Sequence, residues 1–133
     1  MREILENAYD LHVHVAPDVI PRKCDDRELA QRIQSAGMKG CVIKCHYFET
    51  ASRAALLQKE FPELEISGGL ALNLSVGGIN VHTVERFAQM GGGILWFPTM
   101  DARVFQEHKH KDDPTFDASV YLQATDGRGT LLP

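Results

Sequence analysis

Residues 41–74 read CVIKCHYFETASRAALLQKEFPELEISGGLALNL, and this stretch decides the fold. An apolar strand over Cys41–Tyr47 is followed by a helix that Thr50 caps and that Pro62 breaks. A second apolar strand then runs over Glu65–Leu74. Two apolar strands joined by a helix are typical of a parallel βαβ unit, in which helices cover the sheet.

The same alternation extends to both sides of this unit. Before it, a strand over Tyr9–Val15 precedes a helix that begins at Asp25, the first residue of a capping box, and stops at Gly37. After it, Asn80 caps another helix, which ends at a glycine triplet before a strand over Ile94–Phe97. We therefore expect an α/β fold of about four parallel βα units.

Four βα units are half of a (β/α)8 barrel, which usually takes about 250 residues. The sequence predicts a partial TIM-like barrel, with residues 1–133 as one domain that forms the N-terminal half. Ser119–Ala124 and Gly129–Leu132 flank an Asp-Gly pair and predict a C-terminal β-hairpin. The charge run over Glu107–Asp113, which contains His108 and His110, is typical of a solvated segment.

Composition excludes several classes of protein. The chain has 133 residues and a net charge of −4, whereas a nucleic-acid-binding protein would need a basic stripe. No apolar run approaches the roughly 18 residues of a membrane span. The opening residues lack the apolar core of a signal peptide. We expect a small-molecule substrate, with no nucleic acid and no membrane as a partner.

The cysteines and the open sheet lead to two further expectations. Cys24, Cys41 and Cys45 cannot all pair, so we interpret them as reduced thiols in a cytoplasmic protein. A four-stranded half-barrel would leave apolar surface uncovered, which favours a homo-oligomer.

The first strand carries three side chains that could serve a metal site. Asp10, His12 and His14 alternate along it, so a regular strand would place all three on one face. Such polar groups are costly to bury without a purpose. Two imidazoles at this spacing can reach one cation, and the Asp10 carboxylate could orient one of them. The alternative is a pair of structural, hydrogen-bonded histidines.

The second strand strengthens the metal hypothesis. Its alternation places Lys44 and His46 together, with His46 at the C-terminal end, where parallel sheets have their sites. Three histidines from two adjacent strands favour a divalent metal ion: zinc first, then manganese or iron. Lys44 is a candidate catalytic residue that could pair with Asp10, bind an anionic substrate or become a carbamylated ligand. The alternative is a plain ion pair.

Further candidates follow the other strands. Asn73 on the third strand could hydrogen-bond to substrate or anchor a loop, and Asp101 after the fourth strand could be a base, a ligand or a turn residue. Asp18 and Arg22, in the loop after the first strand, could line the mouth of the site and contact substrate, or be solvated. Gly77-Gly78 before a helix could cradle an anion, although a tight turn is the better interpretation.

Several of these stretches carry a resemblance to a known superfamily. The sequence resembles the start of the amidohydrolase-like metal-dependent hydrolases, closest to the polymerase-and-histidinol-phosphatase (PHP) type, in Tyr9-Asp-Leu-His-Val-His14, Ala16-Pro-Asp18 and Val42-Ile-Lys-Cys-His46. More narrowly, it is similar to an uncharacterised amidohydrolase-like family through Gly68-Gly69, Leu72-Asn73, Val76-Gly-Gly-Ile-Asn80 and Trp96-Phe-Pro-Thr99. The similarity covers the N-terminal half of the barrel.

The resemblance implies a metal site at His12, His14 and His46 and a hydrolytic reaction, in which metal-activated water attacks an amide, ester or phosphoester. A non-catalytic alternative is a truncated α/β domain that binds a small ligand or partner and in which the histidines are structural. A third hypothesis is a phosphate-binding module that uses Gly77-Gly78 and Arg22.

Overall fold

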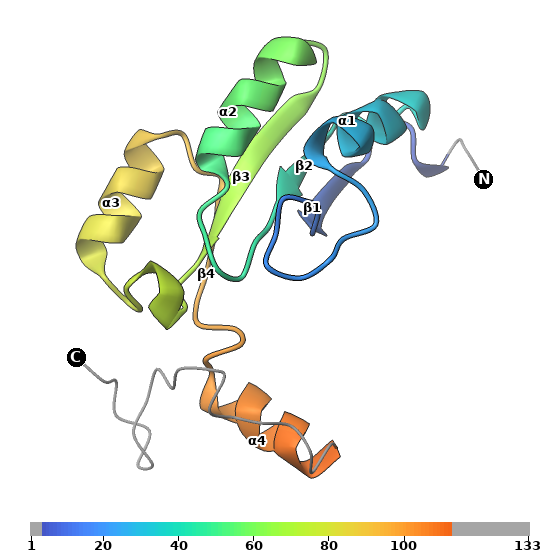
Figure 1. Ribbon diagram of the computed structural model, residues 1–133. Coiled ribbons are helices and arrows are strands. Elements are labelled where there is room, and N and C mark those ends of the chain that lie inside the picture. Colours follow the sequence, from blue (N-terminus) through green and yellow to red (C-terminus); the bar gives the residue numbers. More distant parts are fainter. Residues whose placement is uncertain (1–3, 113–133) are drawn as a thin grey trace.

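The computed structural model describes residues 4–112, and the predicted C-terminal hairpin lies outside them. The elements follow one another as β1 (Tyr9–Val13), α1 (Asp26–Ser35), β2 (Gly40–Ile43), α2 (Ala51–Glu60), β3 (Glu65–Ala71), the 3-10 helix η2 (Leu74–Val76), α3 (Val81–Gln89), β4 (Ile94–Trp96) and α4 (Arg103–Asp112). The strands are parallel, in the order β1-β2-β3-β4, and form a curled half-barrel (Figure 1). The predicted partial parallel barrel is confirmed.

The helices α1, α2 and α3 cover one face of the sheet, and the core lies between the two layers. Its larger cluster joins side chains of β1, β2 and β3 to α1 and α2, including Ile33, Ile43 and Leu57. A smaller cluster packs Leu70 of β3 against Phe87 of α3. None of these three helices covers the opposite face of the sheet. The candidate site lies on that side.

Local signals set the helix boundaries as expected. The Asp25 side chain accepts the backbone N–H of Glu28, and the Glu28 side chain accepts that of Asp25, which completes the predicted capping box. Gly37 ends this helix with a φ of +73°, a conformation that favours glycine. The Asn80 side chain accepts the backbone N–H groups of the first turn of α3.

All four strands end earlier than predicted, which moves candidate site residues, Asn73 after β3 among them, into loops. β1 ends at Val13, and three residues later the Ala16 N–H donates to the Cys24 carbonyl outside the sheet. β2 ends at Ile43, although the Lys44 N–H still donates to the Val13 carbonyl at 2.8 Å. Loop backbone can turn a side chain in directions that a regular strand does not allow.

Thr50 precedes α2 as predicted, but its side chain does not cap the helix. It is fully buried, and its hydroxyl donates to the Ile43 carbonyl and accepts the Gly69 N–H at 2.8 Å. Thr50 thus links the strands β2 and β3 to the start of α2.

Residues 107–112 of the charge run belong to α4, a helix that the sequence analysis did not assign. This helix lies apart from the sheet, beyond the end of β4 (Figure 1). Its charged residues Glu107 and Lys109 are exposed, in agreement with a solvated segment. No helix within residues 4–112 is long and apolar enough to cross a membrane.

Candidate functional site

Three imidazoles meet at the C-terminal ends of β1 and β2. The Nε2 atoms of His12 and His14 lie 3.3 Å apart. The rings of His14 and His46 stack with their centroids 4.7 Å apart. The structure therefore brings together the three histidines that the sequence grouped, whereas their role as metal ligands stays a prediction. Within residues 4–112, no three His, Cys, Asp or Glu side chains already form a group that could hold a metal ion.

Asp10 does not lie on the same face as these histidines, so that prediction is wrong. Asp10 of β1 pairs with Cys41 of β2, and Val13 pairs with Ile43. Between these two pairs β1 therefore advances by three residues and β2 by only two, which is a β-bulge. This bulge reverses the alternation between Asp10 and His12. The Asp10 carboxylate accepts the backbone N–H of His12 at 3.0 Å, where an imidazole contact was expected.

An ion pair borders the histidines on one side. The Arg22 guanidinium lies 2.6 Å from the Asp18 carboxylate, whose side chain is fully buried, and 3.4 Å from Nδ1 of His14. The Cys45 thiol donates to the same carboxylate at 3.5 Å. Burial raises the pKa of Asp18, but hydrogen bonds from Arg22 and the Val19 N–H outweigh it and lower the pKa overall. Asp18 and Arg22 thus lie beside the histidines and Asp18 holds Arg22 in place, whereas their contact with a substrate stays a prediction.

Lys44 borders the site on another side. It is 3% exposed, and its Nζ lies 4.4 Å from the centroid of the Trp96 ring, a cation–π contact. Within the described residues its side chain forms no ion pair or hydrogen bond, so the predicted pairing with Asp10 is not found. Every fully buried side-chain nitrogen among the described residues has a hydrogen-bond partner. Nζ of Lys44 has none, so this atom is not fully buried and reaches the solvent-accessible surface. Burial lowers the pKa of Lys44.

The environment keeps the imidazoles neutral. Burial lowers the pKa of His14 and of His46 to about 4, and nearby positive charges act in the same direction. Lys44 is the strongest of these charges on His46. Burial and Lys44 also lower the pKa of His12, although Asp10 opposes them. Neutral imidazole is the form that has a lone pair for a metal ion.

Asn73 ties together the chain segments that follow three strands. Its amide nitrogen donates to the His46 carbonyl at 2.7 Å and to the Thr99 hydroxyl at 3.0 Å. Its amide oxygen accepts the backbone N–H groups of Thr99 at 2.8 Å and Asp101 at 3.3 Å. The side chain is 2% exposed with all four positions used, so it anchors loops and has none left for a substrate.

Asp101 and Thr99 complete the site from the end of β4. The Asp101 carboxylate accepts the Leu74 N–H at 2.7 Å and so caps η2, the structural alternative of the sequence analysis. Burial raises the pKa of this carboxyl, and the hydrogen bond from Leu74 lowers it by a smaller amount, so the pKa is raised overall. The Thr99 hydroxyl lies 2.8 Å from Nδ1 of His46. Asp101 therefore anchors η2, its catalytic role stays a prediction, and Thr99 contacts a site histidine.

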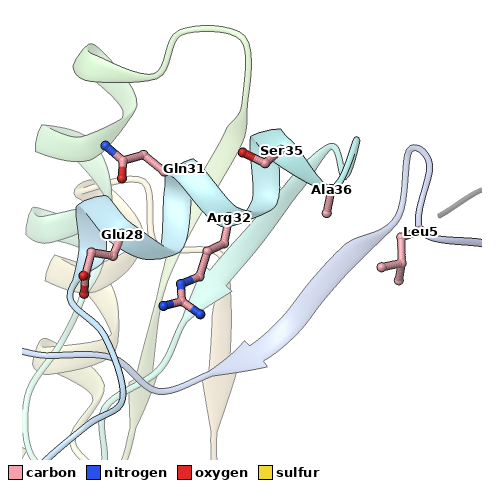
Figure 2. A pocket seen from close by; sticks show the side chains of 6 residues that line it. All are labelled: Leu5, Glu28, Gln31, Arg32, Ser35 and Ala36. Atoms are coloured by element: carbon pink, nitrogen blue, oxygen red, sulfur yellow. The ribbon is translucent and has the colours of Figure 1, made fainter. Parts of the chain in front are cut away.

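Two alternative sites receive no support from the geometry. Gly77 and Gly78 have φ values of +92° and +67°, and their N–H groups donate to Leu74 and Asn73 carbonyls, as in a tight turn. A shallow hollow of about 510 Å³ lies beside α1 and is lined by Leu5, Glu28, Gln31, Arg32, Ser35 and Ala36 (Figure 2). None of these lining residues belongs to the histidine cluster.

The sequence analysis missed Trp96 and Thr99 as site residues. The Trp96 ring lies 5.8 Å from that of His12 by centroids, close to Lys44, and Thr99 contacts His46. Both follow the rule that side chains at the C-terminal ends of parallel strands share one site. Applying that rule to every side chain at the end of the fourth strand, and not to Asp101 alone, would have found them.

The comparisons with known proteins add one finding. A family described as "Family of unknown function (DUF6282)" matches residues 7–133. No curated protein and no solved structure matches the chain. Because the match spans nearly the whole sequence, the chain belongs to the Family of unknown function (DUF6282).

Proposed function

We propose that the chain is a metal-dependent hydrolase of the amidohydrolase or PHP type and that His12, His14 and His46 hold a divalent cation, with zinc as the first candidate. The observation that carries this proposal is the meeting of three neutral imidazoles at the C-terminal edge of a parallel half-barrel. Parallel α/β proteins have their catalytic sites at this edge.

The donor set suits a metal ion of this kind. Zinc–imidazole bonds of about 2.0–2.1 Å in a tetrahedral centre separate ligand nitrogens by about 3.3–3.4 Å. The Nε2 atoms of His12 and His14 are 3.3 Å apart. His46 makes its hydrogen bond through Nδ1, so a ligand bond through Nε2 requires the ring proton to lie on Nδ1, from which it can be donated to the Thr99 hydroxyl. His14 needs one adjustment, because the Arg22 guanidinium lies against its Nδ1 and that nitrogen would have to be protonated.

A bound divalent cation would activate water and polarise the oxygen of an amide, ester or phosphoester. Other side chains of the protein surround the three histidines. Lys44 and Arg22 place positive charge beside the histidines, which favours a substrate that carries or develops negative charge. Thr99 and Asn73 hold the His46 ring and the backbone around it.

Metal content is the first test. The protein is equilibrated with zinc, manganese or iron(II), desalted and measured by mass spectrometry beside a His12→Ala/His14→Ala variant. The proposal expects near-stoichiometric metal in the parent chain and none in the variant. A His82→Ala/His108→Ala variant is the matched control, because both histidines are exposed on helices and should not alter metal content.

Hydrolysis is the second test. The metal-loaded chain is offered an aryl ester, an anilide and an aryl phosphate, and product release is compared with that of the His12→Ala/His14→Ala variant. Turnover that needs the histidines and is lost in chelator supports the hydrolase. Absence of metal from the parent chain after every reconstitution would favour the non-catalytic alternative, in which the histidines are structural.

A further inference from the structure

The Asn73 amide sets the direction of a hydrogen-bond chain that reaches His46. Its oxygen accepts two backbone N–H groups, from Thr99 and Asp101, so its nitrogen must face the Thr99 hydroxyl. That hydroxyl oxygen accepts from the amide and keeps its own proton to donate. Its other contact is Nδ1 of His46, at 2.8 Å. Nδ1 thus accepts, and a neutral His46 carries its proton on Nε2.

A second hydrogen bond, with the same direction from donor to Nδ1, reaches His14. The Arg22 guanidinium, which can only donate, lies 3.4 Å from Nδ1 of His14. His14 therefore also carries its proton on Nε2. This N–H lies 3.3 Å from Nε2 of His12, which can accept it. In both series of hydrogen bonds, a donor outside the cluster, the Thr99 hydroxyl or the Arg22 guanidinium, donates to Nδ1 of a histidine. The proton of each ring therefore lies on Nε2, which faces the centre of the cluster.

Two of the donors in and around the histidine cluster matter here, because neither has a partner among residues 4–112. Nε2 of His46 makes no hydrogen bond there, and neither does Nζ of Lys44. The Lys44 ammonium lies 4.4 Å from the centroid of the Trp96 ring, and that ring lies 5.8 Å from the ring of His12, so the ammonium borders the histidine cluster. Lys44 is 3% exposed, and among residues 4–112 no carboxylate forms an ion pair with its ammonium.

We infer that, when no metal ion is bound, this cluster binds a small oxyanion of the sulfate, phosphate or carboxylate kind through the Lys44 ammonium and the His46 Nε2–H, with Arg22 adding positive charge from the side of His14. The inference does not rest on the proposed function, since it concerns the metal-free protein. The two ligands exclude each other at Nε2 of His46. A cation needs the lone pair of that nitrogen, whereas an oxyanion needs its proton.

The test uses the full chain in EDTA. Thermal unfolding is followed as sodium sulfate is titrated, with sodium chloride at matched ionic strength as the reference and sodium acetate as the carboxylate arm. Sulfate is expected to raise the Tm in a saturable manner that chloride does not reproduce. Equal stabilisation by sulfate and chloride overturns the inference. The acetate arm distinguishes a site for any oxyanion from one that needs a tetrahedral ion.

Two variants locate the binding. Lys44→Met, which keeps the length of the side chain, should weaken sulfate binding by about tenfold or more. Lys59→Met, at an exposed position of α2, removes the same charge and should leave sulfate affinity within about twofold. Equal affinity in Lys44→Met and in the parent chain overturns the inference, and the Tm of each variant without sulfate reports whether it is folded.

The proton positions give an independent readout. Ring-nitrogen NMR of the metal-free chain should find the His46 proton on Nε2. Thr99→Val should remove this preference and weaken sulfate binding, while Thr99→Ser should restore both. A proton on Nδ1 of His46 in the parent chain overturns the inference. The two proposals can fail separately. A failure of the sulfate experiments would not change the expected metal content, and a failure of the metal-content test would not change the expected sulfate binding in EDTA.

Discussion

The ring of Trp96 occupies the space in which a side chain of Gly69 would lie. A Cβ at this glycine would overlap Cζ3 of the ring and come within 3.2 Å of the Ile43 carbonyl oxygen. Gly69 pairs with Ile94 of β4, two residues before Trp96. The missing side chain lets the ring lie across the helix-free face of the sheet, where it contacts Lys44.

Gly69→Ala should therefore displace the Trp96 ring. We expect a loss of about 1–3 kcal/mol in the free energy of unfolding, because overpacking at a close contact forces neighbours to shift. Urea unfolding measures the loss. Trp96 is the single tryptophan, so its fluorescence reports the displacement directly. Adding Trp96→Leu should recover part of the loss, and strictly additive losses would contradict the contact.

Asn73→Ala should be among the most destabilising polar substitutions in the chain. It leaves the Thr99 and Asp101 N–H groups and the His46 carbonyl without their partner in a buried setting, at a cost of about 2–4 kcal/mol. Asn80→Ala is the matched control, since it removes only the exposed cap of α3 and should cost about 1 kcal/mol. Equal losses in urea unfolding would argue against the four-bond anchor.

Lys44→Met should stabilise the fold even though it weakens oxyanion binding. Burial of an ammonium without a carboxylate partner is unfavourable, so we expect a gain of about 1 kcal/mol at pH 7. The folded-state pKa lies below the unfolded value of about 10.5, so the parent chain gains stability as the pH rises between these values. The advantage of the variant should therefore shrink as the pH rises toward about 10.5. A destabilised variant at pH 7 would refute this account.

His14 and His46 should make stability depend on pH on the acid side. Their folded-state pKa of about 4 lies below the unfolded value of about 6.5, so unfolding takes up protons in between. Their contribution is fully present above pH 6.5 and is lost as the pH falls toward 4. Replacing His14 by Asn should flatten the fall of Tm over this window. Replacing the exposed His82 by Asn should leave the slope unchanged, and an unchanged slope in both variants would contradict the prediction.

The sequence determined the elements of this protein because the signals that set them are local. A capping box at Asp25, a glycine with positive φ at Gly37 and an Asn cap at Asn80 act within a few residues of themselves. Alternation of apolar strands and helices was enough to predict parallel order. That order in turn places the C-terminal strand ends at one edge, which is why the three histidines could be grouped in advance.

Only the tertiary structure decided how the site is connected. The bulge that separates Asp10 from His12 is a property of the register between β1 and β2, and no periodicity within β1 reveals it. Likewise, the bonds from Asn73 to His46 and Thr99 join residues 27 and 26 positions apart in the chain. Side-chain hydrogen bonds of this range depend on how loops fold after their strands end, and that is settled by packing rather than by local sequence.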